Sequence, residues 1–333
     1  MNLIKKVEIN KKNSMINIMK FISSILVIAI HTTPISGEWG YFLCNVISRI
    51  AVPFFFVTTG YFYYEKIQNN EKYIRKYIKK IFILYTSWYL IYFILRCFWE
   101  FKSIGFKSIV LLIREYLFSG YYQLWYLSSL IISLIFINYF IKNKMYRLLI
   151  ISSVLLFIVG ILGDSYSGLF NNKIIELIIK VYTLIFGATK TGLCFAVPFL
   201  VLGIFINKYN IKSKIKINNL MIISTSILFI IEALVLKYKK IGIARNMYIV
   251  LIILVPIIFI RLLQSKIEIK ESISIRLQEY STVIYCTHAL FIIIFNRFLN
   301  ISNLYLFILV TLFSLCIAVI LTKYNNRIFK LLV

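Results

Sequence analysis

The chain has 333 residues, of which 61% are hydrophobic and only 15% are charged, and its mean hydropathy is +0.86. Soluble domains carry roughly one-quarter charged residues, so this composition excludes a soluble globular protein and indicates a polytopic membrane protein. The net charge of +26 does not indicate nucleic-acid binding, because the basic residues fall mostly in short loops between apolar runs, where they orient spans and contact anionic lipid head groups.

Apolar segments of bilayer length follow one another along the whole chain. About twenty apolar residues cross the hydrocarbon core once, and ten such segments predict an all-α polytopic membrane protein built as one membrane domain over residues 1–333. The expected spans are 15–35, 40–63, 78–98, 123–141, 147–163, 191–206, 219–236, 247–264, 281–298 and 302–323. The amphipathic segment 173–187 is predicted to be an interfacial or re-entrant helix. The alternative is that this segment is an eleventh crossing, which would reverse the orientation of every later span in the membrane.

The distribution of basic residues predicts the orientation. With both termini in the cytoplasm, the inner regions hold 24 lysine and arginine residues and the outer regions hold 12, as the positive-inside rule requires. The lysine-bearing N-terminal tail before a full-length span predicts an uncleaved signal anchor in the plasma membrane. The five cysteines form no C-x-x-C and no Cys/His pair at metal spacing, so neither a disulfide framework nor a metal site is expected.

The first span carries two ionisable side chains, Lys20 and His31. Such residues are costly in a bilayer-length segment and mark functional sites by default. Eleven residues make about three helical turns, which puts both side chains on nearly the same face, roughly 16 Å apart along the axis. The alternative for Lys20 is that it reaches the inner head groups. The pair predicts a shared polar cavity.

Three later features extend this set. Arg49 lies within the second span and must face a partner or water, either as a phosphate clamp or as a structural arginine. Glu232, inside the seventh span, is expected to orient or balance His31 or Arg49, with an ion pair to Lys237 or Lys239 as the alternative. His288 in the ninth span is expected to be a packed structural histidine. A basic patch at the cytoplasmic end of the third span contains Arg75, Lys79 and Lys80. It is suited to binding the phosphates of a nucleotide-like cofactor, with anchoring to lipid head groups as the alternative.

These residues occur in motifs that resemble the acyltransferase-3 family of integral membrane acyltransferases. The likeness is carried by Lys20-x10-His31, by Val52 to Phe56 with Gly60, by Leu124-Trp125-Tyr126-Leu127, and by Tyr285 with His288. More narrowly, the chain resembles the membrane half of the vancomycin-resistance type serine racemases. That likeness lies in His31-Thr32-Thr33-Pro34, Gly163-Asp164-Ser165 with Gly168-Leu169, Thr189-Lys190-Thr191-Gly192 leading to Pro198, Glu232, and Met247-Tyr248.

The sequence departs from these patterns at three positions. The family often has arginine where Lys20 and Lys190 stand and commonly has aspartate where Asn17 stands. Lysine keeps the charge of arginine but cannot form its two parallel hydrogen bonds. Phosphate binding at these positions is therefore more compatible with lysine than planar, bidentate binding of a carboxylate. In the racemases a soluble racemase domain follows, whereas this chain stops at Val333, so racemase activity is not expected.

The resemblance implies transfer of an acyl group, expected to be acetyl, from cytoplasmic acetyl-CoA to a hydroxyl of an extracytoplasmic cell-wall or surface glycan. No permanently bound cofactor is expected. We predict that Arg75, Lys79 and Lys80 hold the CoA phosphates and that the pantetheine arm passes Lys20. His31 then acts as general base or carries the acyl group, and Arg49 steadies the thioester oxygen. The resemblance also implies substrate binding by the residues Trp125, Tyr126, Asp164 and Lys190.

Two other functions stay open. The racemase-like relatives suggest an amino-acid permease for serine, in which the same intramembrane residues form a substrate and proton path. A non-catalytic subunit or sensor would bind a cell-wall precursor without turnover or flux. The outer loops contain no sugar-binding signature that names the acceptor.

Overall fold

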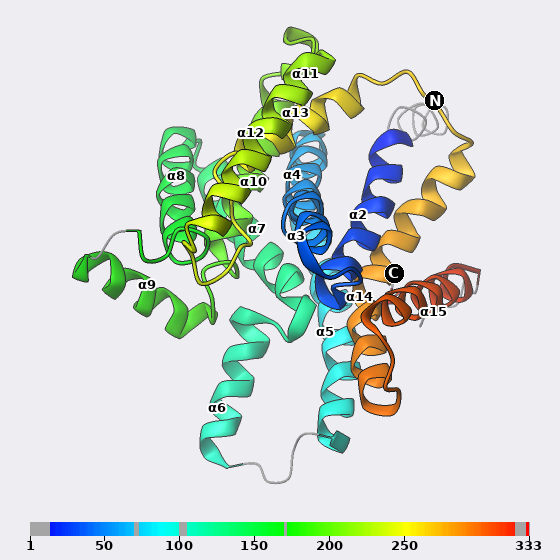
Figure 1. Ribbon diagram of the computed structural model, residues 1–333. Helices are drawn as coiled ribbons and strands as arrows, with labels where there is room; N and C mark the ends of the chain where they lie inside the picture. The colour runs from blue at the N-terminus through cyan, green and yellow to red at the C-terminus, as the bar shows by residue number, and fades with distance from the viewer. Residues whose placement is uncertain (1–13, 70–72, 100–104, 170–171, 324–330, 333) are drawn as a thin grey trace.

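The computed structural model of the protein describes residues 14–69, 73–99, 105–169, 172–323 and 331–332, and its regular elements within these ranges are helices (Figure 1). The α-helices are α2 (Ser14–Thr32), α3 (Gly37–Asn45), α4 (Ala51–Asn69), α5 (Tyr73–Trp99), α6 (Phe106–Arg114), α7 (Trp125–Lys142), α8 (Tyr146–Leu162), α9 (Lys173–Phe186), α10 (Leu193–Lys208), α11 (Ile211–Lys214), α12 (Asn219–Tyr238), α13 (Leu251–Leu263), α14 (Glu271–Phe298) and α15 (Asn303–Lys323). Three short turns of other helix types are η1 (Ile47–Ile50), η2 (Glu115–Ser119) and η3 (Tyr122–Leu124).

The predicted apolar segments coincide with these helices. In the part of the chain that the structure describes, seven helical stretches are long and apolar enough to cross a membrane, namely 14–32, 37–68, 73–99, 122–142, 219–238, 271–298 and 303–323. The three shorter apolar helices α8, α10 and α13 match the remaining predicted segments. An all-α polytopic membrane fold is therefore confirmed, while the number of ten crossings stays a prediction.

Helix α9 has the amphipathic character that the sequence predicts for 173–187. It begins after Asn172, whose side chain accepts hydrogen bonds from the backbone N–H groups of Ile174 and Ile175, and it ends at Gly187, whose φ of +82° suits glycine. None of its residues is buried, and the helix is inclined to α8 in Figure 1. Its placement at the interface remains an expectation.

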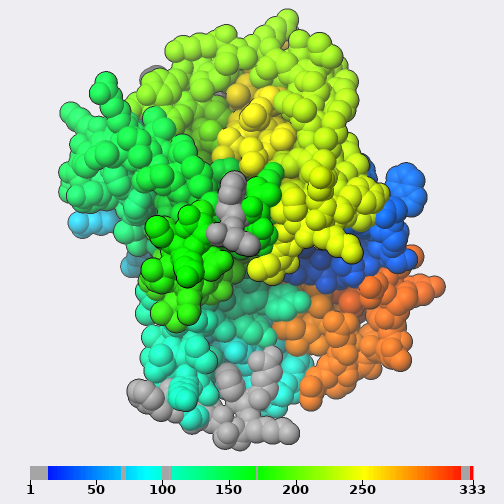
Figure 2. All heavy atoms as spheres, turned by 60° about the vertical axis from the view of Figure 1, so that its left-hand side comes forward, coloured from blue at the N-terminus to red at the C-terminus, as the bar shows by residue number. Residues whose placement is uncertain are grey.

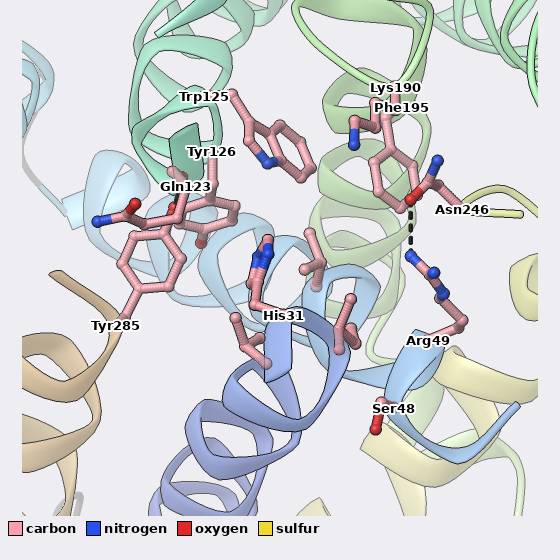
Figure 3. A pocket seen from close by; sticks show the side chains of 13 residues that line it. His31, Ser48, Arg49, Gln123, Trp125, Tyr126, Lys190, Phe195, Asn246 and Tyr285 are labelled. Atoms are coloured by element: carbon pink, nitrogen blue, oxygen red, sulfur yellow. Dashed lines mark hydrogen bonds between the residues drawn. The ribbon is translucent and has the colours of Figure 1, made fainter. Parts of the chain in front are cut away.

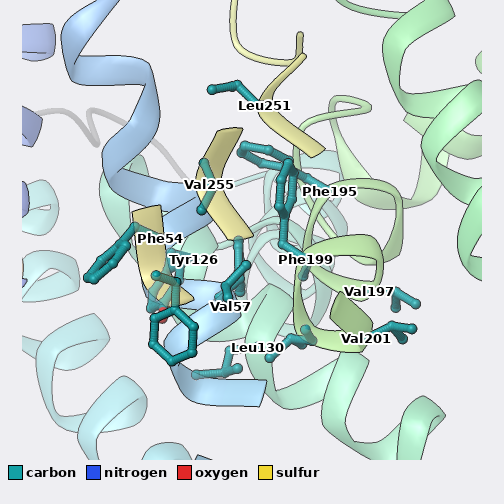
Figure 4. Close-up of a cluster of buried hydrophobic side chains, with 14 of the residues drawn as sticks. Phe54, Val57, Tyr126, Leu130, Phe195, Val197, Phe199, Val201, Leu251 and Val255 are labelled. Carbon is teal, nitrogen blue, oxygen red and sulfur yellow. The ribbon is translucent and has the colours of Figure 1, made fainter. Parts of the chain in front are cut away.

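The core lies where α4 and α10 pack backbone to backbone. A Cβ on Gly60 would lie 2.1 Å from the Leu200 carbonyl oxygen, and one on Gly203 would lie 2.0 Å from that of Val57. Only glycine allows this approach, which is how apolar helices pack closely in membranes. Buried side chains such as Phe54, Val57 and Phe199 fill the space around the contact (Figure 4).

The other main packing unit joins the two ends of the chain. Helix α14 lies beside α2 and α15 (Figure 1), and the Asn17 amide donates a hydrogen bond of 2.9 Å to the Ser274 hydroxyl. This pairing sets the last turn of α2, which carries His31, against the middle of α14.

Candidate functional site

A cavity with about 550 Å³ of empty space lies at the end of α2 that carries His31 (Figure 3). Its wall is formed by Val27, Ile30, His31, Ser48, Arg49, Val52, Gln123, Trp125, Tyr126, Lys190, Phe195, Asn246 and Tyr285. Five of the predicted site residues thus meet in one wall, although they come from α2, η1, α7 and the loop before α10. Sequence reasoning did not single out Gln123 or Asn246.

The His31 imidazole lies among aromatic rings. Its centroid is 5.4 Å from that of Tyr122 and 5.4 Å from that of His288. Within the described part of the chain His31 has no hydrogen-bond partner, so its ring nitrogens are available to a bound molecule.

His288 is fully buried, as the sequence predicted for a packed histidine, but it packs directly behind His31. Its Nδ1 lies 3.1 Å from the Ile284 carbonyl oxygen, which can only accept, so Nδ1 carries the proton and Nε2 is an acceptor. Nε2 has no partner among the described residues. The signal in the sequence was the pairing of His288 with Tyr285 inside one apolar segment.

Gln123 ties the start of α7 to α14. Its side-chain amide nitrogen donates to the Tyr92 hydroxyl at 2.5 Å and to the Cys286 backbone carbonyl at 3.0 Å, and the Tyr285 hydroxyl donates to the backbone carbonyl of Gln123. The adjacent Trp125 ring stacks on Phe195, with centroids 6.0 Å apart. These contacts fix the aromatic part of the wall.

Arg49 is held by neutral oxygens. Its Nη1 donates to Asn246 Oδ1 at 2.6 Å and its Nη2 to Asn45 Oδ1 at 3.0 Å, while Nε is buried without a partner in the described residues. The Asn246 amide in turn donates to Asp164 Oδ2 at 2.7 Å. Asn246 therefore relays the Asp164 charge to Arg49.

Asp164 is 3% exposed and lies behind the cavity wall. Its Oδ1 accepts hydrogen bonds from the backbone N–H groups of Asn246 and Met247 and from the Ser165 hydroxyl. Internal donors thus bind both carboxylate oxygens, and the expected contact of Asp164 with substrate stays a prediction. The same loops meet again where Gly242 N–H donates to the Ser167 carbonyl, and their green and yellow surfaces adjoin in Figure 2.

Lys190 extends from the short loop between α9 and α10 into the cavity. It has no hydrogen-bond or ion-pair partner in the described residues. Burial, and next the nearby Arg49 guanidinium, lower the pKa of its ammonium, while Asp164 opposes this.

Glu232 does not meet His31, contrary to the sequence expectation. Its carboxylate accepts hydrogen bonds from the Tyr166 hydroxyl and from the backbone N–H groups of Ile249 at 2.6 Å and Val250 at 2.9 Å. Free N–H groups at a helix start need such acceptors. Glu232 therefore binds the N–H groups of the two residues just before α13. Of the two lysines named as alternative partners, Lys237 pairs with Glu38 instead.

Lys20 also lies outside the cavity wall, which reaches along α2 only to Val27. Its ammonium sits 5.7 Å from the centre of the Phe62 ring. Among the described residues, the wall of the His31 cavity does not include Lys20, so the predicted shared cavity is not confirmed. Three turns of separation put the two side chains on one face, but they meet different helices, α4 and α14.

The basic patch of α5 is exposed, and Arg75, Lys79 and Lys80 lie on its first two turns. A second, more open groove with about 1340 Å³ of empty space lies beside the first turn of α2 and the end of α13. It contains four basic residues, Lys212, Lys216, Arg261 and Lys266. The sequence analysis did not predict this groove.

Curated relatives of this chain are racemases. An amino-acid racemase from Enterococcus faecalis is 30% identical over 340 residues, covering 94% of this chain and 46% of that protein. A serine/alanine racemase from Enterococcus gallinarum is 29% identical over 264 residues, covering 74% of this chain and 37% of that protein. The chain thus spans less than half the length of these relatives. No solved structure matches it.

Nearly the whole chain also matches one family. The match, to a family described as an acyltransferase domain, runs over residues 13–323 and includes every residue of the cavity wall. The protein therefore belongs to the acyltransferase-3 family.

Proposed function

We propose that the protein moves an acyl group, expected to be acetyl, from cytoplasmic acyl-CoA to a hydroxyl of an extracytoplasmic acceptor such as a cell-wall or surface glycan. The observation that carries this proposal is the position of His31, whose imidazole lines the cavity together with Arg49 and has no partner in the described chain. A free imidazole beside a fixed guanidinium is suited to acyl transfer.

The chemistry follows from these two groups. In the direct route a His31 nitrogen removes the proton of the acceptor hydroxyl while the hydroxyl oxygen attacks the thioester carbonyl carbon. The C–S bond breaks, and the CoA sulfur leaves with the proton from the imidazolium. In the alternative route His31 attacks first, carries the acyl group as an acyl-imidazole after CoA thiol leaves, and passes it to the hydroxyl. In both routes Arg49 stabilises the oxyanion.

The donor is proposed to bind from the cytoplasmic side. The exposed Arg75, Lys79 and Lys80 on the first turns of α5 supply donors for the CoA phosphates. Lys20, half-buried above Phe62, lies between that surface and His31 along α2. It remains a candidate contact for the donor.

The test is transfer of radiolabel in proteoliposomes that contain the purified protein. Labelled acetyl-CoA is supplied on one side and envelope material on the other, and acylated acceptor is recovered after washing. We expect label in the acceptor with wild-type protein and none with His31→Ala. Equal labelling by the two proteins would overturn the proposal.

Amino-acid transport is the second candidate function. It is favoured by the curated relatives, which are named as racemases of amino acids, and by the cationic side chains Arg49 and Lys190 in the cavity, which suit a carboxylate. Accumulation of labelled serine in the same proteoliposomes, without consumption of acetyl-CoA, would identify a permease and not an acyltransferase.

A further inference from the structure

We infer that the acceptor is an anion, with a carboxylate or phosphate group that binds Lys190 while its hydroxyl reacts at His31. This inference rests on the proposed acyl transfer and adds the chemical class of the acceptor. It is carried by the charges and the unpaired donors of the cavity.

The cavity wall is basic and contains no acidic residue. His31, Arg49 and Lys190 line it, and none of the thirteen wall residues is aspartate or glutamate. The nearest carboxylate, Asp164, is separated from the cavity by Asn246 and is already bonded to internal donors. Two cations thus face one shielded carboxylate. Unpaired charge within a membrane protein is costly, so the cavity is expected to bind an anionic ligand.

The hydrogen-bonding capacity of the wall points the same way. An ammonium has three donors and no acceptor, and those of Lys190 find no acceptor in the described chain. Arg49 adds a buried Nε donor without a partner. A carboxylate or phosphate supplies the acceptor oxygens that these donors lack, and charge-assisted bonds of this kind are the strong ones.

The loop that carries Lys190 is held in place on both sides. The Tyr182 hydroxyl donates to the Thr191 carbonyl at 2.6 Å and accepts from the Cys194 N–H at 3.0 Å. The Gly192 N–H donates to the Ser129 hydroxyl at 2.7 Å. Lys190 is therefore positioned in advance, unlike a surface lysine on a free loop, and less entropy is lost when it binds a ligand.

The two cations have different tasks. Arg49 is fixed by Asn45 and Asn246, which suits it to one small target, the thioester oxygen. Lys190 keeps all its donors and enters the cavity from the loop before α10, whereas His31 enters from α2 (Figure 3). An acceptor held by its anionic group at Lys190 presents the rest of its body to His31.

The test uses membrane vesicles of the encoding organism with the full-length protein and labelled acetyl-CoA. The labelled acceptor is applied to an anion-exchange column at neutral pH. We expect retention and elution by salt. A labelled acceptor that passes unretained overturns the inference, whereas an absence of any labelled acceptor overturns the proposed acyl transfer itself, and with it this inference.

Variants at Lys190 assign the contact. With the isolated acceptor, Lys190→Met is expected to raise the acceptor KM by about tenfold or more, which corresponds to about 1.4 kcal/mol. Lys190→Arg keeps the positive charge and is expected to leave the acceptor KM near that of the wild type. Lys180→Met, on the exposed surface of α9, is the matched control and is expected to leave KM unchanged. Equal melting temperatures exclude misfolding. An anionic acceptor whose KM is the same with Lys190→Met overturns the role of Lys190.

Discussion

The imidazole rings of His31 and His288 lie 5.4 Å apart, although the two residues come from opposite ends of the chain. His31 lines the cavity, and His288 lies behind it without reaching the wall. Because Nδ1 of His288 donates to Ile284, its unpartnered Nε2 is a hydrogen-bond acceptor in a buried place. This pair links α2 to α14 at the centre of the candidate site.

His31 is the residue on which acyl transfer depends in our proposal. Replacing it by alanine is expected to abolish transfer, and His31→Gln is expected to do the same, because an amide keeps hydrogen-bonding capacity but neither accepts a proton near neutral pH nor carries an acyl group. Initial rates with labelled acetyl-CoA, normalised to inserted protein, provide the measurement. Activity in the glutamine variant near that of wild type would remove His31 from the chemistry.

His288 is predicted to act as a positioning residue for His31. His288→Leu fills the space of the ring without its nitrogens, and we expect kcat to fall about tenfold while the acceptor KM changes little, because His288 does not touch the cavity. Steady-state kinetics separate the two parameters. A parallel loss of melting temperature and activity would show instead that His288 serves packing alone.

Much of the architecture follows from the sequence because apolar segments long enough to cross a bilayer strongly indicate membrane helices. Each predicted apolar segment is helical in the structure, and α9 has the predicted amphipathic pattern. Intramembrane charge singled out His31 and Arg49, and the family resemblance singled out Trp125, Tyr126 and Lys190. That the five meet in one wall is a finding of the structure.

The partners of individual side chains did not follow from the sequence. Helical spacing put Lys20 and His31 on one face, but it carries no information on which neighbouring helix each would meet. Glu232 looked like a partner for His31 because its segment is apolar, yet the open N–H groups at the start of α13 provide a nearer set of donors. Asn246, in a loop between apolar segments, gave no sign of its contact with Arg49.

Glu232 is predicted to contribute stability and not chemistry. Glu232→Ala removes the acceptor of the Ile249 and Val250 N–H groups and is expected to lower the free energy of unfolding by about 1–3 kcal/mol. Thermal denaturation in detergent measures the loss. Activity per folded molecule is expected to persist. A variant of unchanged stability and no activity would restore Glu232 to the catalytic site.

The basic patch of α5 is predicted to bind the acyl donor. Changing Arg75, Lys79 and Lys80 together to glutamine is expected to raise the KM for acetyl-CoA about tenfold and to leave the acceptor KM unchanged, because phosphate contacts are lost on the donor side only. The triple glutamine variant of Lys142, Lys144 and Arg147, exposed cations at the turn where α7 ends and α8 begins, is the charge-matched control.

A different result would move the donor site. If the α5 variant behaves like the control and a glutamine triple at Lys216, Arg261 and Lys266 raises the KM instead, the CoA phosphates occupy the groove between α2 and α13. The same kinetic assay decides between the two sets of cations.

The hydrogen bonds that connect Asp164 to Asn246 and Asn246 to Arg49 depend on which atoms donate and which accept. Asp164→Asn keeps the shape but replaces an acceptor by a donor opposite the Asn246 amide nitrogen. If Asn246 turns its amide to compensate, it presents a donor to Arg49 and loses that bond. Either arrangement leaves a buried donor unpaired, which costs about 1–3 kcal/mol of stability, and activity is expected to fall as Arg49 loses its orientation.

The double variant Asp164→Asn with Asn246→Asp reverses the mismatch. The new carboxylate at 246 accepts from Arg49 on one oxygen and from the amide at 164 on the other, so the direction of the hydrogen bond is exchanged and the total charge is kept. We expect recovery of most of the melting temperature and of kcat relative to Asp164→Asn alone. If the double variant is no better than the single one, Asp164 acts through its other bonds, to Ser165 and Met247, and the relay does not orient Arg49.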